Sequence, residues 1–393
     1  MTKAEHVSSR QLEISYGTSR RRFVAERLSD IREAYGVKRN TLAKLLDLSP
    51  SMITAYESRS TPPEYIIIKL AKFFNVETDY FFRPKPYSNL STVLFRDFAK
   101  AKTTDRERAI VLLKWSIEIE RQLSKYAVLP KTNVPDLNLP SNPEMIGDED
   151  IENAALALRK YWGVGLEPIS NVIRLLEKNG VIVTDASLEA DAIDALMTTD
   201  EHRKFYILNN SDIRSGSRKR FTTLHDFAHG LLHRNVDPSL LEVKNYKVSL
   251  EWQAHKFATA FLLPRESFLS DIYGSTLGSL SLAKPKWRVS VGAMIYRLYN
   301  LGQISSSRRD MLLKDRGRRG WTKVEPFDLD IPVESPVLFK KAFQLAQQHF
   351  GVDGEHIARE IGLPQKVVAE MIGVTESELR PKDLKIRPAN MKL

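Results

Sequence analysis

Two histidines four residues apart are the side chains of this sequence best suited to metal chemistry. His225 and His229 lie within the stretch FTTLHDFAHGLLH, and residues four apart on an α-helix share one face, with Cβ atoms about 5–6 Å apart. Two imidazoles so placed can bind one tetrahedral zinc ion. Because the chain has no cysteine, the remaining protein ligand must be a histidine or a carboxylate. We expect Glu251, 22 residues after His229, to be the third ligand. His233 continues the same face and is an alternative ligand, and histidines that are only packed or solvated are the simplest alternative.

The periodicity around these histidines predicts the elements that must position them. Apolar residues at helical spacing predict helices at 150–162, 168–179, 221–234 and 250–264, and β-branched or aromatic runs predict strands at 181–184 (VIVT) and 204–209 (KFYILN). Pro264 should end the last of these helices because a proline inside a helix removes a hydrogen bond. The metal ligands should therefore lie on two helices of an α+β region.

The N-terminal part of the sequence has the pattern of a helix-turn-helix. In VKRNTLAKLLDLSPSMITAYESRS, an apolar stripe with the small Ala43 is followed by a short turn and by a second helix. Ser49 should cap that second helix, with Pro50 in its first turn, where the missing N–H would be unpaired anyway. The segment therefore predicts a short-helix cluster that can place one helix in a DNA groove.

The rest of the chain is predicted to be mainly helical. A long amphipathic helix at 104–127 either packs on a neighbouring domain or serves for dimerisation, and residues 129–143 are rich in Pro and Asn and are typical of a linker. The fold class is mainly α: a five-helix helix-turn-helix domain, an α+β zincin-like domain and a helical C-terminal region. The expected boundaries are 1–22 for a basic tail, 23–83 for the helix-turn-helix, 84–148 for a helical linker, 149–326 for the α+β domain and 327–393 for the C-terminal region.

Composition and charge narrow the class of protein. The 393 residues are 42% hydrophobic and 27% charged, which is ordinary for a soluble protein. The absence of cysteine fits the cytoplasm, and residues 1–22 have no apolar segment long enough for a signal peptide or membrane span. The net charge of +10 favours an acidic partner such as nucleic acid. Residues 281–323 alone hold 11 Lys and Arg against two Asp and Glu, a charge that either contacts phosphates or solvates a helical surface.

From about Phe23 to Phe82 the sequence resembles the Xre, or Cro/CI-type, repressor family, through LSDIREAYGVKRNTLAKLL, SPSMITAYES and LAKFFNVETDYFF. The resemblance implies that the helix after the turn lies in the major groove of a double-stranded DNA operator. The residues it assigns to base edges are Pro50, Ser51, Met52, Thr54 and Ala55, and those it assigns to phosphates are Arg39 and Arg59. The base-facing positions hold no Arg, Gln or Asn for a bidentate base contact, so specificity would depend on hydroxyls, thymine methyls or DNA shape. The alternative is a helix-turn-helix used only to bind protein or to dimerise.

Residues 150–326 resemble the ImmA/IrrE family of zinc peptidase-like domains, through LEPISNVIRLLEKNGVIV, RKRFTTLHDFAHGLLH, EWQAHKFATAFLLP and KPKWRVSVGAMIYRLYNLGQIS. The resemblance implies that His225, His229 and Glu251 bind zinc and that Asp226 is the general base. Asp226 departs from the family's Glu and is one methylene shorter, which puts rapid hydrolysis in doubt because a base must reach within about 2.6–3.2 Å of the proton it takes. His255 stands where the family has Asn, which alters the surroundings of the metal ligands.

Together these features predict a cytoplasmic transcriptional regulator, most simply a repressor that binds a palindromic operator as a homodimer. Its zinc domain would cleave a regulator protein, sense a ligand in a pocket near the metal, or bind a partner. The alternative is a DNA-binding antitoxin whose zinc-peptidase-like fold binds a toxin without catalysis.

Overall fold

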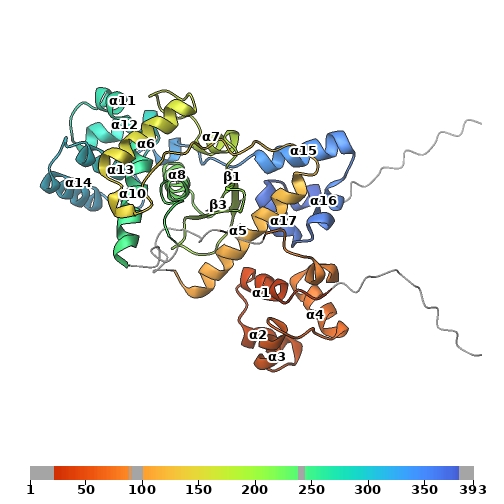
Figure 1. Cartoon of the computed structure of the whole chain (residues 1–393). Coiled ribbons are helices and arrows are strands. Elements are labelled where there is room, and N and C mark those ends of the chain that lie inside the picture. The colour runs from red at the N-terminus through yellow and green to blue at the C-terminus, as the bar shows by residue number, and fades with distance from the viewer. Residues whose placement is uncertain (1–21, 88–89, 91–100, 238–243, 380–393) are drawn as a thin grey trace, which may run out of the picture.

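A computed structural model describes residues 22–87, 90, 101–237 and 244–379 of the chain (Figure 1). The basic tail predicted for residues 1–22 lies outside this part except for its last residue, as do residues 380–393 at the C-terminal end. The described chain is mainly helical and contains one small sheet, as the sequence pattern predicts. No described helix has the length and apolar character that a membrane crossing requires.

The N-terminal helices form the predicted helix-turn-helix, at the lower right of Figure 1. They are α1 (Ala25–Ala34), α2 (Arg39–Leu46), α3 (Pro50–Tyr56), α4 (Glu64–Phe74) and the 3-10 helix η1 (Thr78–Phe82), so the fifth helix is a 3-10 turn. Ser49 accepts a hydrogen bond from the Met52 amide, and Pro50 begins α3. Asp47 ends α2 in the left-handed conformation, with φ at 57°, which Asp tolerates better than most residues. The cap and the left-handed residue together set the turn between α2 and α3.

A three-stranded sheet lies at the centre of the chain. Its strands are β1 (Ile182–Ala186), β2 (Ala195–Thr199) and β3 (Phe205–Asn210), in the order β1-β3-β2. β1 runs parallel to β3, with Ile182 opposite Tyr206, and β2 runs antiparallel to β3, with Met197 opposite Ile207. The sequence pattern predicted β1 and β3 but not β2, whose segment ALMTT has no alternation because the strand is buried on both faces.

Helices surround this sheet. The long helix α5 (Thr103–Leu123) precedes it, with η2 (Pro143–Met145), α6 (Asp148–Tyr161) and α7 (Val172–Lys178). After the sheet come α8 (Gly216–Leu232), α10 (Lys244–Leu262), α11 (Arg265–Asp271), α12 (Leu277–Trp287), α13 (Val291–Asn300), α14 (Ser306–Arg318) and η3 (Asp328–Asp330). The C-terminal region is helical, with α15 (Leu338–Phe350), α16 (Gly354–Ile361), α17 (Gln365–Ile372) and η4 (Glu376–Leu379). α8 and α10 begin five and six residues before the predicted starts at 221 and 250. The N-cap at Ser215, whose side chain accepts from the Arg218 amide, accounts for the start of α8.

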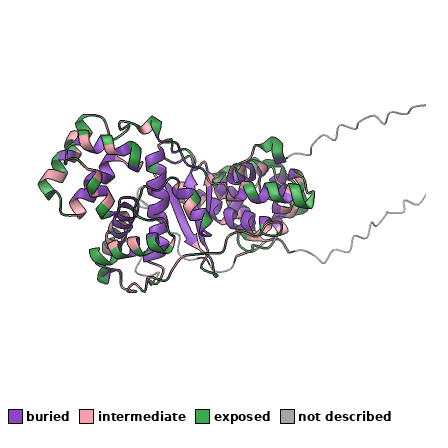
Figure 2. Cartoon of the chain, turned by 90° about the horizontal axis from the view of Figure 1, so that it is seen from above, coloured by how far each residue is buried: buried purple, intermediate pink, exposed green. Residues whose placement is uncertain are grey.

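The sheet divides two hydrophobic cores, because alternate residues of each strand point to opposite faces. Ile182, Tyr206 and Leu208 belong to one core, which also contains α5, the C-terminal helices and the helix-turn-helix. Val183 and Ile207 belong to the other core, which contains α6, α8, α10 and α13. In Figure 2 the buried strands accordingly lie between helices on both sides. Burial on both faces explains why these strands are continuously apolar.

Helix α5 connects the helix-turn-helix with the sheet. Trp115, Ile119 and Leu123 on its apolar stripe are fully buried inside the chain, so this stripe is part of the core. Its Glu118 accepts two hydrogen bonds of 2.7 Å from Nη1 of Arg27 on α1, and both side chains are almost fully buried. The predicted linker at 84–148 thus includes a core helix, whereas the predicted domain boundaries themselves stay predictions.

The C-terminal helices also contact the helix-turn-helix. Arg83, just after η1, donates to the carbonyl oxygens of Arg359 and Glu360 at the end of α16, over 2.9 and 2.7 Å. Arg27 additionally donates to the carbonyls of Arg83 and Pro84. The junction after η1 is therefore held from two sides, by α1 and by α16.

Candidate metal centre and nucleic-acid interface

The histidines lie in the C-terminal half of α8, a helix that is buried along its length. α8 packs between the sheet and α10, and the side chains of His225, Asp226, His229 and His233 are each 3% exposed or less. Gly230 allows this close packing, since a Cβ there would overlap Met197 of β2 and Phe205 of β3. The position of α8 against the sheet turns the histidines toward α10.

The two histidines and Glu251 of α10 converge on one point. Nε2 of His225 and Nε2 of His229 are 3.1 Å apart. The Glu251 carboxylate approaches both rings, with Oε2 at 3.2 Å from His225 and Oε1 at 3.3 Å from His229. The structure therefore brings together, from two helices, the three residues predicted to be ligands, although Glu251 follows His229 by 22 residues in the chain.

The donor set has the chemistry and the spacing of a zinc site. Ligands bound to zinc at about 2.0–2.1 Å in tetrahedral geometry lie about 3.3 Å from one another. The three separations of 3.1, 3.2 and 3.3 Å are close to that value. Two imidazole nitrogens and a carboxylate also match the ligand types that zinc prefers in the absence of cysteine. The residues present thus fit a three-ligand zinc site that leaves one position open.

Hydrogen bonding at the site favours an ionised carboxylate on Glu251. Burial raises the pKa of Glu251, but hydrogen bonds with His225 and His229 outweigh it and hold that pKa below its ordinary value. Asp226 is buried, and a carboxylate oxygen of this residue lies within 4.8 Å of a ring nitrogen of His225 and of His229. Asp226 is therefore close enough to act on a group bound at the site, although it follows His225 directly in the helix.

His233 lies behind the ligands and faces His229. Its Nδ1 is 3.1 Å from Nδ1 of His229, on the opposite side of the His229 ring from Glu251. Its Nε2 is 3.0 Å from Oε1 of Gln253, and the amide nitrogen of Gln253 donates to the carbonyl oxygens of Pro143 and Ile146. Burial, and secondarily His229, lowers the pKa of His233 well below its ordinary value. Glu251 rather than His233 therefore faces the shared nitrogens of His225 and His229.

His255 lies one helical turn after Glu251 and borders a cavity. Its ring centroid is 5.0 Å from that of Phe221 and 5.3 Å from that of Tyr296. The cavity has a volume of about 560 Å³ and lies beside the N-terminal half of α8, so it begins one turn from His225. Its walls include Arg218, Phe221, His255, Tyr296, Arg316 and Trp321. A polar and aromatic cavity thus lies next to the donor set, large enough for several side chains of a bound segment.

The exposed face of α3 contains the residues expected to touch base edges. Ile53 and Tyr56 of this helix are buried in the domain core. The base-facing positions are exposed at Pro50, Ser51, Met52 and Thr54 and half-buried at Ala55. Thr54 donates its hydroxyl proton to the Pro50 carbonyl over 3.1 Å. The face is therefore small and uncharged, as the sequence indicated.

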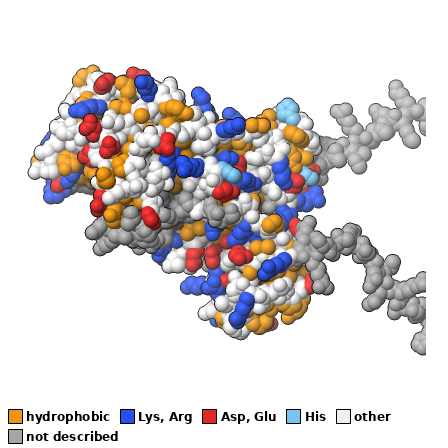
Figure 3. All heavy atoms as spheres, in the orientation of Figure 1, with side chains coloured by type: hydrophobic (Ala, Val, Ile, Leu, Met, Phe, Trp, Pro, Cys, Tyr) orange, Lys and Arg blue, Asp and Glu red, His pale blue; other side chains and the backbone are white. Residues whose placement is uncertain are grey.

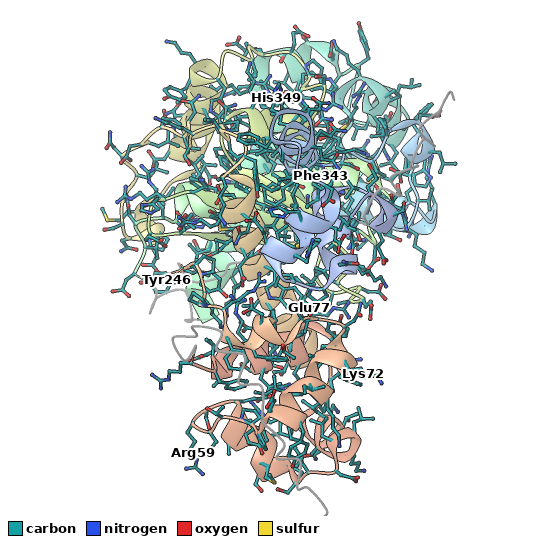
Figure 4. The ribbon with its side chains drawn as sticks, turned by 90° about the vertical axis from the view of Figure 1, so that its right-hand side faces the viewer. Arg59, Lys72, Glu77, Tyr246, Phe343 and His349 are labelled. Carbon is teal, nitrogen blue, oxygen red and sulfur yellow. The ribbon has the colours of Figure 1, made fainter. Side chains whose placement is uncertain are left out.

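Two arginines flank this face. Arg39, at the start of α2, is half-exposed and donates to the buried Glu57 carboxylate over 2.6 Å. The same carboxylate pairs with Arg32 of α1, so one buried acid holds both guanidinium groups. Arg59 follows α3, is exposed and points away from the body of the chain in Figure 4. Both predicted phosphate-binding residues are thus accessible at the edges of the reading face.

Some of the basic side chains of residues 281–323 are buried in ion pairs. Neither phosphate contact nor solvation of a helical surface, the two roles expected for this charge, predicted that. Lys284 is fully buried and pairs with Glu325 and Asp328 at 2.9 and 2.6 Å. Arg297 is 2% exposed and makes two bonds of 2.6 Å to Glu152. The exposed members are Lys286, Lys314, Arg318, Arg319 and Lys323. Figure 3 shows Lys and Arg side chains over α14 on one side of the molecule and on the helix-turn-helix on another, with Asp and Glu between them.

Comparison with protein families agrees with these two sites. Residues 28–81 match the family described as helix-turn-helix, and residues 176–299 match the peptidase family M78, described as the IrrE N-terminal-like domain. The chain joins an Xre-type helix-turn-helix to an ImmA/IrrE-like domain. The IrrE-like match contains His225, Asp226, His229 and Glu251. No curated protein matches the chain significantly. These matches support a DNA-binding regulator that carries a peptidase-like domain.

One member of the site was not predicted from the sequence. Gln253 contacts His233 and two backbone carbonyls, although it lies only two residues after Glu251. Its position in an unbroken helical pattern gives no signal of its own, because glutamine is common on helix surfaces. Only its burial, at 4% exposure, distinguishes it.

Proposed function

We propose that this regulator is a repressor whose ImmA/IrrE-like domain binds zinc and cleaves a regulator protein, either a partner or another copy of itself. The observation that carries the proposal is the convergence of His225, His229 and Glu251, with donor atoms 3.1–3.3 Å apart. The adjoining cavity of about 560 Å³ supports it, since a peptide segment needs a place to bind beside the ligands.

Zinc at this site would polarise a peptide carbonyl and lower the pKa of a water molecule. The protein contributes the remaining steps. Asp226, which is buried beside both histidines, takes the proton of the attacking water. Asp226 is one methylene shorter than the family's usual Glu, so its carboxylate has a shorter reach. A displacement near 1 Å can cost about a hundredfold in rate, so we expect slow cleavage.

The DNA-binding half acts through α3 of two copies bound to a palindromic operator. Helix-turn-helix dimers place their reading helices one helical turn of DNA apart, which matches two half-sites. The exposed hydroxyls of Ser51 and Thr54 and the apolar Met52 contact base edges. Arg39 and Arg59 contact phosphates, and Glu57 fixes the position of Arg39 by the bond of 2.6 Å.

Metal analysis and a cleavage assay test the enzymatic half. The purified protein should contain one zinc per chain, and Glu251→Ala should lose it. Incubated with candidate regulators and with itself, the zinc protein should produce defined fragments that Asp226→Ala abolishes and Asp226→Glu increases. Asp330→Ala, at an exposed aspartate outside the site, is the matched control. Equal cleavage by the parent and by Asp226→Ala would remove Asp226 from the mechanism, and a metal-free parent would reject the zinc proposal.

Genome-wide occupancy tests the repressor half. The full chain should occupy a small number of palindromic sites, including one upstream of its own gene, and expression from that promoter should rise when the protein is deleted. An adjacent small toxin gene, with toxin binding and no cleavage, would instead support the antitoxin. Binding that is equal for all sequences at moderate salt would reject the operator.

A further inference from the structure

A series of hydrogen bonds runs from His229 through the side chains of His233 and Gln253 to the protein backbone. We propose that His233 and Gln253 are positioning residues that fix the His229 ring as a metal ligand through Nε2 and anchor it to the backbone of residues 143–146. The inference rests on the proposed zinc site, and it concerns residues to which neither the motif nor the family match gives a role.

Hydrogen-bond chemistry determines the direction of each link. The carbonyl oxygens of Pro143 and Ile146 can only accept, so the amide nitrogen of Gln253 faces them, at 2.7 and 3.1 Å. The amide oxygen of Gln253 therefore faces His233, and Nε2 of His233 donates to it over 3.0 Å. In a neutral imidazole one nitrogen donates and the other accepts. Nδ1 of His233 is consequently an acceptor.

The same reasoning extends to His229. Its Nδ1 lies 3.1 Å from Nδ1 of His233 and has to donate the proton of that bond. Its Nε2 is then the nitrogen left to bind a metal ion, and it faces His225 and Glu251 at 3.1 and 3.3 Å. A metal-binding histidine usually donates its other N–H to a carboxylate, carbonyl or water, which fixes tautomer and ring orientation. Here a second histidine takes that place.

The hydrogen bonds of His233 and Gln253 are shielded from solvent. His233 is 3% exposed and Gln253 is 4% exposed, so water does not compete for either bond. The outermost acceptors belong to η2 (Pro143–Met145) and to Ile146, just before α6. Asn142 caps this turn by accepting from the Glu144 amide over 3.0 Å. The stretch between α5 and α6 therefore ends in a fixed turn that supports the metal centre.

Substitutions at residue 233 separate positioning from packing. His233→Asn keeps an acceptor near the place of Nδ1, because the Asn amide oxygen occupies the corresponding position along the side chain. His233→Leu has the same branched shape as Asn and offers no acceptor. Removing an outer partner of a metal ligand typically weakens metal affinity about 10–100-fold. His233→Leu and Gln253→Leu should show this loss, and His233→Asn should recover most of it.

The experiment measures zinc affinity and, separately, the His229 tautomer. Zinc affinity of the full chain is measured by competition with a chromophoric chelator, and His349→Leu, at an exposed histidine of α15 (Figure 4), is the control. ¹⁵N NMR of the zinc-free protein should show a protonated Nδ1 for His229 in the parent and in His233→Asn. In His233→Leu the proton should shift to Nε2, the position that free histidine prefers.

The two readouts distinguish failure of this inference from failure of the proposed function. A parent that binds no zinc overturns the zinc site, whereas the tautomer measured in that same protein still decides the role of His233. If His233→Leu binds zinc as tightly as His233→Asn and keeps Nδ1 of His229 protonated, the positioning role is overturned. Loss of folding in His233→Leu is detected by its NMR spectrum, and Gln253→Leu then decides through the same two measurements.

Discussion

A buried glutamate that joins α7 to α15 predicts a specific pH dependence of stability. Oε1 of Glu177 accepts hydrogen bonds of 2.8 Å from the amides of both Val337 and Leu338, and the residue is 4% exposed. Burial raises the pKa of Glu177 from 4.5 to about 7; the two amide bonds and Lys341 act against the rise, and Asp185 adds to it. The carboxyl group is therefore mainly protonated in the folded chain at pH 6.

The sign and size of the effect follow from linkage. The folded pKa lies above the unfolded one, so the contribution of Glu177 to stability is fully present below about pH 4.5 and is lost as the pH rises through about 7. The difference of roughly 2.5 pKa units corresponds to about 3 kcal/mol of unfolding free energy. Above pH 7 the loss is complete and the curve becomes flat with respect to this group.

Glu177→Gln isolates this contribution, because a glutamine oxygen can accept the same two amide bonds and does not titrate. The variant and the parent should differ little at pH 5, and at pH 8 the variant should be more stable by about 3 kcal/mol. Urea unfolding followed by tryptophan fluorescence at each pH measures the difference, and other titrating groups cancel in it. Glu149→Gln, at an exposed position of α6, is the control. A stability difference that stays constant from pH 5 to 8 would refute the assignment of a raised pKa to Glu177.

Three further predictions concern packing and DNA binding. Glu118→Gln should destabilise the chain by about 3–5 kcal/mol, because it leaves the buried charge of Arg27 without a counter-charge. The double variant Arg27→Met/Glu118→Leu should recover part of that loss in urea unfolding. An equal loss in both variants would contradict the ion-pair explanation. Gly230→Ala should cost about 1–3 kcal/mol by overpacking α8 against Met197 and Phe205, and an unchanged midpoint of thermal unfolding would contradict it. Arg59→Ala should lower the slope of log affinity against log salt by about one on operator DNA while leaving sequence preference unchanged; an unaltered slope would remove Arg59 from the phosphate contacts.

The sequence pattern was most informative where one residue's neighbours in the chain decide its surroundings. Ser49 and Pro50 start α3 as predicted, since capping depends on the next three amides. The step of four between His225 and His229 placed both rings on one face, since helix periodicity is local. β1 and β3 were recognisable because strands buried on both faces must be apolar. β2 was not, because its burial on both faces removes the alternation that marks a strand. The early start of α8 depends on the cap at Ser215, and the structure gives no local reason for the early start of α10.

The sequence by itself determined the two functional segments, a capped reading helix and a histidine pair on one helical face, because both depend on spacings of a few residues. Only the tertiary structure decided that Glu251 faces the histidine pair while His233 lies behind it, that Gln253 joins them to the turn before α6, and that α5 is a core helix. It also decided that Lys284 and Arg297 form buried ion pairs and do not lie on the surface. Each of these depends on which helices pack together, and that is set by the burial of apolar area over the whole chain, a property that no local pattern contains.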